Sequence, residues 1–427
     1  MFRLISHFEH FEGKVDIQLP FLNSEVYKYD FLKKKGDQNC FTIEKDQLGH
    51  RCKLSYFVGV DWIVENETAL YVAPKLDKES GQTDYLKMLF SALKHPDIAQ
   101  HTEELFEVKF DSPFIEISQQ QDLLTPLLVV QFLRIVKEIT RKGLRKSYYK
   151  VSNNLQAKVK GKVMVGQTVK HNILKNRPLH TFCMYDEFGV NGLENRLLKR
   201  ALIFINRYLP SLSISHTDKY SLDMLNYIMP AFVSVSDEVN LSEIKQSHIS
   251  AFYKEYTQAI SLAKLILKRF GYNINNTDRS EKIRTPPFWI DMSKLFELYV
   301  LGLLKDRFPK VSTINYQFGN RGNKLDFLLN SDDYKMVVDA KYKIRYTSKV
   351  DHLDIRQVSG YARLRKVYDF LGVSKDKVID CLIIYPDQKN GSSDLFTDLR
   401  RNEINEYYGV FKVGIKLPMQ SDMVRNF

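Results

Sequence analysis

The sequence predicts an α+β protein of several domains: a β-rich N-terminal domain (residues 1–105), a mainly helical middle domain (106–280) and a C-terminal α/β domain (281–427). Three observations support this prediction. The first region is dominated by strand-like segments, the middle by helical ones, and the last by the order helix, strand, strand, strand, helix, strand. With 427 residues and 44% hydrophobic content, the chain can build more than one core.

In the N-terminal domain we expect a hairpin of residues 51–64 and 68–73, followed by a helix over residues 85–94. The clearest helix of the middle domain begins at Thr125-Pro126, a cap followed by a first-turn proline. The helices expected in the middle domain cover residues 125–142, 194–209 and 247–270. Residues 273–287 are polar, turn-rich and nearly free of apolar residues, which predicts a linker.

The C-terminal domain is expected to begin with a helix over residues 292–308. Its apolar residues recur with a 3.6-residue period between Asp291, a good N-cap, and Pro309, which ends a helix. The elements expected after it are strands at residues 313–318, 324–329 and 335–342, a helix at 354–371, and strands at 378–385 and 410–417. The second and third of these strands form a hairpin, because the residues between them, 330–333, are turn formers.

Asp339 and Lys341 lie two residues apart on the return strand of this hairpin. Side chains alternate faces along a strand, so these two share a face, and Asp326 on the neighbouring strand can converge on them. Two carboxylates beside a lysine form a site for a hard cation such as Mg²⁺, which would neutralise a phosphate and activate a water. Taken alone, Asp339 and Lys341 are better explained as a solvated cross-strand charge pair.

Three further residues, Gln357, Tyr361 and Glu297, help to decide between a metal site and a solvated charge pair. Gln357 and Tyr361 are four residues apart and share one helix face. Asp354 and Gln357 also fit a capping box, which explains Gln357 but leaves Tyr361 as an ordinary helix aromatic. Glu297, at the edge of the buried face of the 292–308 helix, is either a surface glutamate or a third carboxylate that reaches the metal site.

This order of elements and side chains resembles the PD-(D/E)XK nuclease core, in the branch that carries a Gln-x-x-x-Tyr helix. The resemblance implies roles for six residues: Asp326 and Asp339 as metal ligands, Lys341 as the catalytic lysine, Gln357 and Tyr361 lining the site, and Glu297 in place of the first-helix acid. Leu325 stands where the family name has proline, and that proline has no chemical role in the site.

Motifs outside this core narrow the resemblance to the McrC family, the nuclease subunits of type IV McrBC restriction systems. The N-terminal motifs are Gly59-Val60, residues 71–75 ending in Pro74-Lys75, and residues 84–90. The middle motifs are residues 143–144, 148–149, 160–163, 183–187 and 195–199. The resemblance implies a Mg²⁺-dependent endonuclease that acts on double-stranded DNA containing modified cytosine.

The sequence contains no Gly-x-x-x-x-Gly-Lys-[Ser/Thr] motif, and residues 319–324, the nearest pattern, have the wrong spacing and run into a strand. We therefore do not expect this chain to hydrolyse nucleotide. The resemblance implies a separate AAA+ GTPase partner of the McrB type, which binds GTP and recognises the modified base, and whose GTPase is stimulated by the N-terminal part of this chain.

Two other hypotheses stay open. In the first, the chain is a non-cutting regulatory subunit with a vestigial nuclease fold. Against it, evolutionary drift in such a subunit would lose Asp326, Asp339 and Lys341 first. In the second and more distant hypothesis, the chain is a basic nucleic-acid-binding protein in which Asp-x-Lys arises by chance. The net charge of +12 and pI of about 9.2 suit DNA, but also solubility or an acidic protein partner.

The basic residues between 141 and 177 are interleaved with Tyr148 and Tyr149. Such a stretch either binds phosphates and stacks bases or forms a solvated face. The cysteines lack Cys-x-x-Cys spacing, so we expect buried thiols in a reducing cytoplasm at Cys40, Cys52, Cys183 and Cys381. We find no signal-type segment and no apolar run near the ~20 residues that span a bilayer, so no membrane contact is expected.

Overall fold

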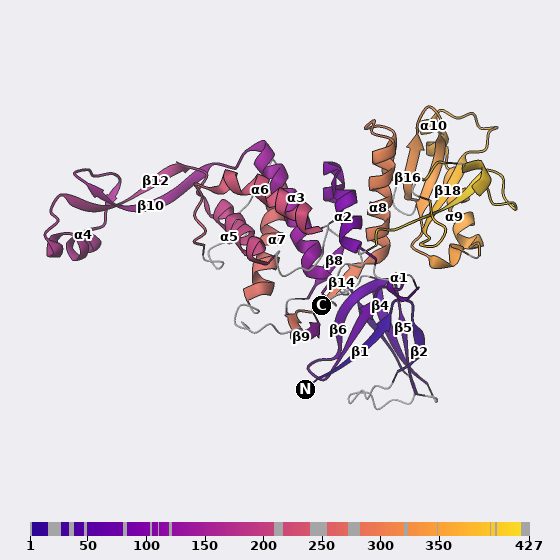
Figure 1. Ribbon diagram of the computed structural model, residues 1–427, viewed down its shortest axis with the longest axis horizontal. Coiled ribbons are helices and arrows are strands. Elements are labelled where there is room, and N and C mark those ends of the chain that lie inside the picture. Colours follow the sequence, from indigo (N-terminus) through magenta and orange to yellow (C-terminus); the bar gives the residue numbers. More distant parts are fainter. Residues whose placement is uncertain are drawn as a thin grey trace. The chain divides into compact units, whose positions relative to one another are not determined.

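The computed structural model describes residues 2–15, 27–33, 38–46, 49–79, 83–102, 105–109, 111–118, 122–208, 217–239, 254–271, 282–319, 323–347, 349–392, 394–397 and 399–419. The chain forms two compact units: residues 1–127 with 276–427, and residues 128–275. The three expected regions do not coincide with these units, since the first and third share one. Several sheets combined with helices give the mixed α and β composition that the sequence predicted (Figure 1).

One sheet of the first unit joins strands that are far apart in the sequence, in the order β1-β7-β6-β14-β8. The bounds of its strands are Arg3–Phe8 (β1), Phe57–Val64 (β6), Thr68–Ala73 (β7), Phe106–Val108 (β8) and Phe288–Asp291 (β14). β6 and β7 pair antiparallel, which confirms the expected hairpin. β14 lies between β6 and β8 and so brings residues that follow the middle region into the N-terminal sheet.

A second sheet, in the order β2-β5-β4-β3, shares an apolar core with the first. Its strands are Glu12–Lys14 (β2), Tyr27–Leu32 (β3), Asn39–Asp46 (β4) and Gly49–Leu54 (β5). In the shared core, the ring centroids of Phe41 and Trp289 are 5.8 Å apart. The strand expected over residues 51–64 is thus two strands, β5 and β6, which belong to different sheets.

The four cysteines are free and buried, as expected. Burial raises the pKa of Cys52 and of Cys381 to about 12, because an apolar environment disfavours the thiolate. These thiols are therefore protonated parts of the core.

Gly59 explains one of the motifs found in the sequence. Its φ is +154°, and a Cβ atom there would lie 2.0 Å from the carbonyl oxygen of Phe288 in β14. Only a residue without a side chain permits this approach of β14 to β6.

Gly59→Ala is therefore expected to lower the free energy of unfolding by about 2–4 kcal/mol, since β14 must shift away from β6. Urea unfolding followed by circular dichroism would measure the change. Gly360→Ala is the matched control, because a Cβ there meets nothing within 4 Å in α9 (His352–Ala362), and a gain of about 0.5–1 kcal/mol is expected. A Gly59→Ala protein as stable as wild type would contradict this account.

The first unit also contains a five-stranded sheet whose strands follow chain order, β15-β16-β17-β18-β19. The strands are Ile314–Phe318 (β15), Leu325–Asn330 (β16), Lys335–Ala340 (β17), Asp380–Pro386 (β18) and Val410–Ile415 (β19). β15, β16 and β17 pair antiparallel, while β17, β18 and β19 pair parallel. All five expected strands are confirmed, with ends that differ by up to two residues.

Helix α8 (Met292–Arg307) begins as predicted at Asp291, whose carboxylate accepts a hydrogen bond from Lys294 N at 2.8 Å. It is buried on more than the expected stripe, because α2 (Tyr85–Leu93) also packs on it. A Cβ at Gly302 would lie 2.9 Å from Cα of Ala92 in α2. The expected helix over residues 85–94 is thus confirmed, and the short α1 (Leu76–Glu79) precedes it.

The single helix expected over residues 354–371 is wrong. The chain forms α9, breaks at residues 363–364, and continues as α10 (Arg365–Leu371). Apolar residues of both helices pack on one face of the five-stranded sheet, against Leu328 of β16 and Val337 of β17. This face carries the candidate site.

In the second unit, the expected helices are confirmed by α3 (Leu124–Lys142), α5 (Leu193–Tyr208) and α7 (Lys254–Gly271), and α6 (Thr217–Ile228) adds a fourth. Residues 247–253 lie outside the described residues. Of the expected linker, residues 273–281 also lie outside them. Its next part is no linker, because β13 (Lys282–Thr285) pairs antiparallel with β9 (Ile115–Ser118) in the first unit.

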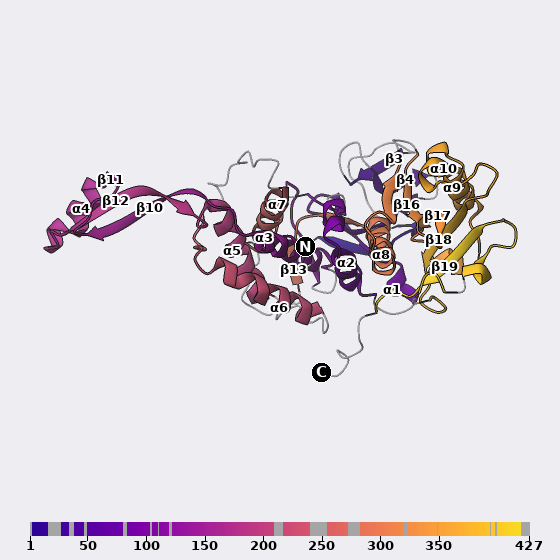
Figure 2. The ribbon, with the colours of Figure 1, turned by 90° about the horizontal axis from the view of Figure 1, so that it is seen from above.

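The second unit also holds a long hairpin that the sequence did not predict. β10 (Ser147–Gln156) pairs with β12 (His180–Gly189) over ten residues, and β11 (Lys162–Val163) and α4 (Val165–His171) lie between them in sequence (Figure 2). β10 is largely exposed and β12 is mostly half-buried, with Cys183 as its one buried residue, so neither strand shows the alternation of buried apolar and exposed polar residues by which strands are recognised. The prediction of a mainly helical middle region missed them for this reason.

Candidate active site

The hairpin of β16 and β17 brings two aspartates together. Phe327 lies opposite Val338 in this antiparallel pair, and one more step in the same register sets Asp326 opposite Asp339. Directly opposed residues share a face of the sheet. The Asp326 carboxylate accepts a hydrogen bond from Ala340 N at 2.9 Å, which holds it over the end of β17.

Lys341 connects this pair to α9. Its Nζ lies 2.8 Å from Asp339 Oδ2 and donates to Gln357 Oε1 at 3.0 Å. Gln357 Nε2 in turn donates to the hydroxyl of Tyr361 at 3.0 Å. A continuous polar chain, Asp339–Lys341–Gln357–Tyr361, therefore runs from the sheet to one face of the helix.

Asp354 belongs to the same site, although the sequence suggested a capping role for it. The N-cap of α9 is Asp351, whose side chain accepts from Leu353 N, so the capping-box interpretation is wrong. Asp354 is 6% exposed, and its Oδ2 accepts from Lys343 Nζ at 2.6 Å and from the Tyr346 hydroxyl at 2.7 Å.

The other Asp354 oxygen, Oδ1, lies 4.0 Å from Lys341 Nζ. A signal was present in the sequence, because Asp354, Gln357 and Tyr361 follow the i, i+3, i+7 spacing of one helix face.

Glu297 lies on α8, with its Oε1 3.5 Å from Lys294 Nζ. Its charge contributes to raising the pKa of Asp326 and, with a hydrogen bond, that of Tyr316, so it lies close to the aspartate pair. Among the described residues, however, no group of three or more His, Cys, Asp or Glu side chains is arranged to hold a metal ion. Glu297 is thus a neighbour of the aspartate pair and does not form a three-carboxylate cluster with it.

The electrostatics of the site favour a cation. Burial, then the charges of Asp339 and Glu297, raises the pKa of Asp326 well above its usual value. Burial also raises the pKa of Asp339, although Lys341 opposes this. Asp339 Oδ2 is buried and has the Lys341 ion pair but no hydrogen bond. Two buried carboxylates whose negative charges lie close together fit Mg²⁺, which often binds one or two protein carboxylates and completes its shell with water and phosphate.

Lys341 is kept protonated. Burial acts to lower its pKa, but the carboxylates of Asp339, Asp326 and Asp354 outweigh burial and raise it. The side chain can therefore donate hydrogen bonds or stabilise negative charge, and it is a poor neutral base.

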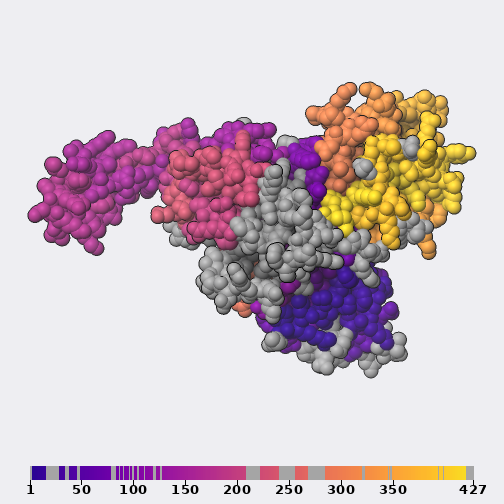
Figure 3. Space-filling model, in the orientation of Figure 1, coloured from indigo at the N-terminus to yellow at the C-terminus, as the bar shows by residue number. Residues whose placement is uncertain are grey.

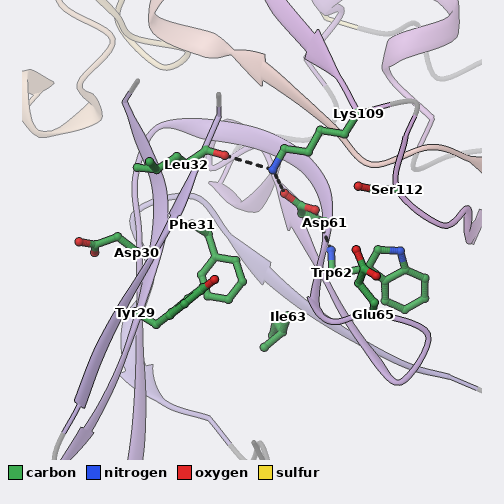
Figure 4. Close-up of a pocket in the computed structure, with 10 residues that line it drawn as sticks. All are labelled: Tyr29, Asp30, Phe31, Leu32, Asp61, Trp62, Ile63, Glu65, Lys109 and Ser112. Atoms are coloured by element: carbon green, nitrogen blue, oxygen red, sulfur yellow. Dashed lines mark hydrogen bonds and ion pairs between the residues drawn. The ribbon is translucent and has the colours of Figure 1, made fainter. Parts of the chain in front are cut away.

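A pocket of about 380 Å³ lies elsewhere in the first unit and contains none of the six predicted site residues (Figure 4). Its Lys109 donates to Asp61 at 2.5 Å and to the carbonyl of Leu32 at 3.1 Å. Asp61 also accepts from Trp289 Nε1 at 2.9 Å. These charges are satisfied within the protein, so the ion pair supports the N-terminal sheets.

The basic stretch of the middle region lies largely on the unexpected hairpin. Tyr148 is 75% exposed, and the lysines at positions 158, 160, 162 and 170 are exposed as well. Figure 3 shows the surface of this hairpin in magenta. Exposure fits phosphate contact and a solvated face alike, so DNA contact here stays a prediction.

Comparison with known proteins identifies the family. A family model described as "McrBC 5-methylcytosine restriction system component" matches residues 53–370, more than half of the chain. No curated protein matches. Among the part of the chain that is described, no helix is long and apolar enough to cross a membrane.

Two similar solved structures come from Thermococcus gammatolerans. One is a half-complex of McrB AAA+ hexamers with bound McrC, with a TM-score of 0.37, 15% identity, and coverage of 86% of this chain and 79% of that chain. The other is an McrBC complex, with a TM-score of 0.30, 14% identity, and coverage of 70% and 87%. The family model, and not this structural likeness, carries the assignment.

Proposed function

Because the chain belongs to the McrBC 5-methylcytosine restriction system component family, we propose that it is the McrC-type endonuclease subunit of such a system. Its substrate would be double-stranded DNA containing modified cytosine, and its reaction the Mg²⁺-dependent hydrolysis of a phosphodiester bond. The observation that supports this best is the convergence of Asp326, Asp339 and Lys341 at one end of a β-hairpin.

Asp326 and Asp339 would hold Mg²⁺ through their carboxylate oxygens. The ion would supply charge neutralisation at the phosphate and a more acidic water. Lys341 keeps its proton, so it is placed to hold the attacking water or to stabilise the charge that develops on the phosphate. Gln357 orients the ammonium group by accepting one of its hydrogens, and Tyr361 fixes the Gln357 amide.

We also propose that the chain works with an AAA+ GTPase of the McrB type, which would bind GTP and recognise the modified base. The sequence supports a separate motor because it contains no P-loop motif. One of the similar structures contains McrB AAA+ hexamers with bound McrC. The N-terminal part of this chain would stimulate the GTPase of its partner.

The test is a reconstituted complex of this chain, an McrB-type partner and GTP, assayed on DNA with and without 5-methylcytosine. Cleavage is expected only with methylated DNA and Mg²⁺, and EDTA is expected to abolish it. A wild-type complex that stimulates GTP hydrolysis and never cuts would instead support the regulatory subunit with a vestigial nuclease fold.

A further inference from the structure

Glu9, Lys75 and Tyr342 form a buried cluster that the proposed chemistry leaves unexplained. Glu9 follows β1, Lys75 follows β7 in the Pro74-Lys75 motif, and Tyr342 directly follows Lys341. The Glu9 side chain is 0% exposed and that of Lys75 is 13% exposed. Tyr342 is 4% exposed.

The cluster holds Tyr342 at two points. The Tyr342 hydroxyl donates to Glu9 Oε1 at 2.9 Å, and the Tyr342 carbonyl accepts from Lys75 Nζ at 2.8 Å. Lys75 Nζ also lies 3.8 Å from the centre of the Tyr342 ring.

Glu9 and Lys75 are joined to each other as well. The Lys75 backbone N donates to Glu9 Oε1 at 2.9 Å, and Lys75 Nζ lies 3.7 Å from Glu9 Oε2. Two strand ends of the N-terminal sheet thus hold the residue after the proposed catalytic lysine.

Stability alone explains this cluster poorly. Burial raises the pKa of Glu9 to about 6 and lowers that of Lys75, which shows that desolvation works against both charges. Apolar residues of similar volume commonly stabilise a protein as well as a buried ion pair does, or better. Such a pair can instead specify one geometry.

The backbone that this cluster holds lies next to the proposed catalytic lysine, Lys341. β17 ends at Ala340, so Lys341 and Tyr342 lie beyond the regular strand. On the side of β18, Lys341 N still donates to the carbonyl of Ile384 at 2.8 Å. The next fixed points along the chain are the Tyr342 carbonyl and hydroxyl, which Lys75 and Glu9 hold.

We propose that Glu9 and Lys75 are positioning residues for the nuclease site: by holding Tyr342, they fix the backbone from which Lys341 reaches Asp339 and Gln357. This inference rests on the proposed function and extends it. The N-terminal sheet then takes part in cleavage chemistry in addition to any contact with the partner.

The test uses the full chain with its AAA+ partner, GTP, Mg²⁺ and methylated DNA. Lys75→Met removes the hydrogen bond to the Tyr342 carbonyl, and Tyr342→Phe removes only the hydroxyl. Each is expected to lower the single-turnover cleavage rate by roughly 10- to 100-fold, since small displacements of a catalytic group cost this much. The DNA concentration that gives half the maximal rate should change by less than about twofold, because no DNA contact is removed.

Two further variants separate positioning from general damage. Glu9→Gln/Lys75→Met removes both buried charges and keeps an acceptor for the Tyr342 hydroxyl, so it should fold at least as well as wild type and still cut slowly. Lys109→Met breaks another partly buried ion pair of the N-terminal sheets, with Asp61, and should melt at a lower temperature yet cut at the wild-type rate once folded.

Wild-type cleavage rates in Lys75→Met and Tyr342→Phe would overturn the positioning role but not the proposed function. So would a loss of rate in Lys109→Met that matches theirs. A wild-type complex that does not cut would overturn the proposed function, and the positioning role with it.

Discussion

Asp339→Ala is expected to abolish DNA cleavage by the reconstituted complex while leaving GTPase stimulation within about twofold of wild type. The substitution removes a buried carboxylate that would hold Mg²⁺ and that pairs with Lys341 at 2.8 Å. Loss of several kcal/mol of transition-state stabilisation corresponds to at least about a 10³-fold lower rate. Single-turnover cleavage and steady-state GTP hydrolysis, measured on the same preparation, would check both parts.

Asp332→Ala is the matched control, because Asp332 lies in the turn of the same hairpin with its side chain 96% exposed. It should cut like wild type. Asp339→Asn, which keeps the shape of the side chain, should be as inactive as Asp339→Ala. If a folded Asp339→Ala protein lost GTPase stimulation as completely as cleavage, the separation of the two roles would be wrong.

The second large effect concerns the partner. The purified chain alone is expected to leave methylated and unmethylated DNA uncut in Mg²⁺, and cutting should appear only when the AAA+ partner and GTP are added. An ungated phosphodiesterase with a net charge of +12 would bind any DNA and destroy that of its host. Gating must therefore come from something that this chain lacks.

A supercoiled plasmid assay at several salt concentrations would measure this directly. The chain alone should bind methylated and unmethylated plasmid equally, with an affinity that falls steeply as salt rises. Efficient cleavage of methylated DNA by the chain alone would make it a self-sufficient nuclease and end the gated-subunit proposal.

The elements around the candidate site could be predicted from the sequence because their signals are local. The turn formers between β16 and β17 and the two-residue spacing of Asp339 and Lys341 fix which side chains share a face. The spacing of Gln357 and Tyr361 does the same for α9. Local patterns sufficed here because Lys341 directly follows the strand that contains Asp339, and because Gln357 and Tyr361 lie within one helix.

What the sequence could not give depends on contacts between distant segments. Asp354 is an exception, because its spacing from Gln357 and Tyr361 was a local signal; it resembled a helix cap, but the cap of α9 is Asp351 and Asp354 accepts from Lys343 and Tyr346. Glu9 and Lys75 lie more than 260 residues before Tyr342, and no periodicity links them. The β10–β12 hairpin was not predicted for another reason: β10 is largely exposed, β12 is mostly half-buried, and neither has a regularly alternating buried face.

The position of β14 has a consequence for how this protein is made. β6, all of whose residues are buried, ends at residue 64, and its neighbour β14 begins at residue 288. Residues 65–287, 223 in all, must be synthesised in between, which takes roughly 10–45 s at typical rates of synthesis. For that time one edge of an apolar strand lacks its partner, an open edge of the kind that promotes aggregation. We therefore expect the nascent chain to bind chaperones until its last third has left the ribosome.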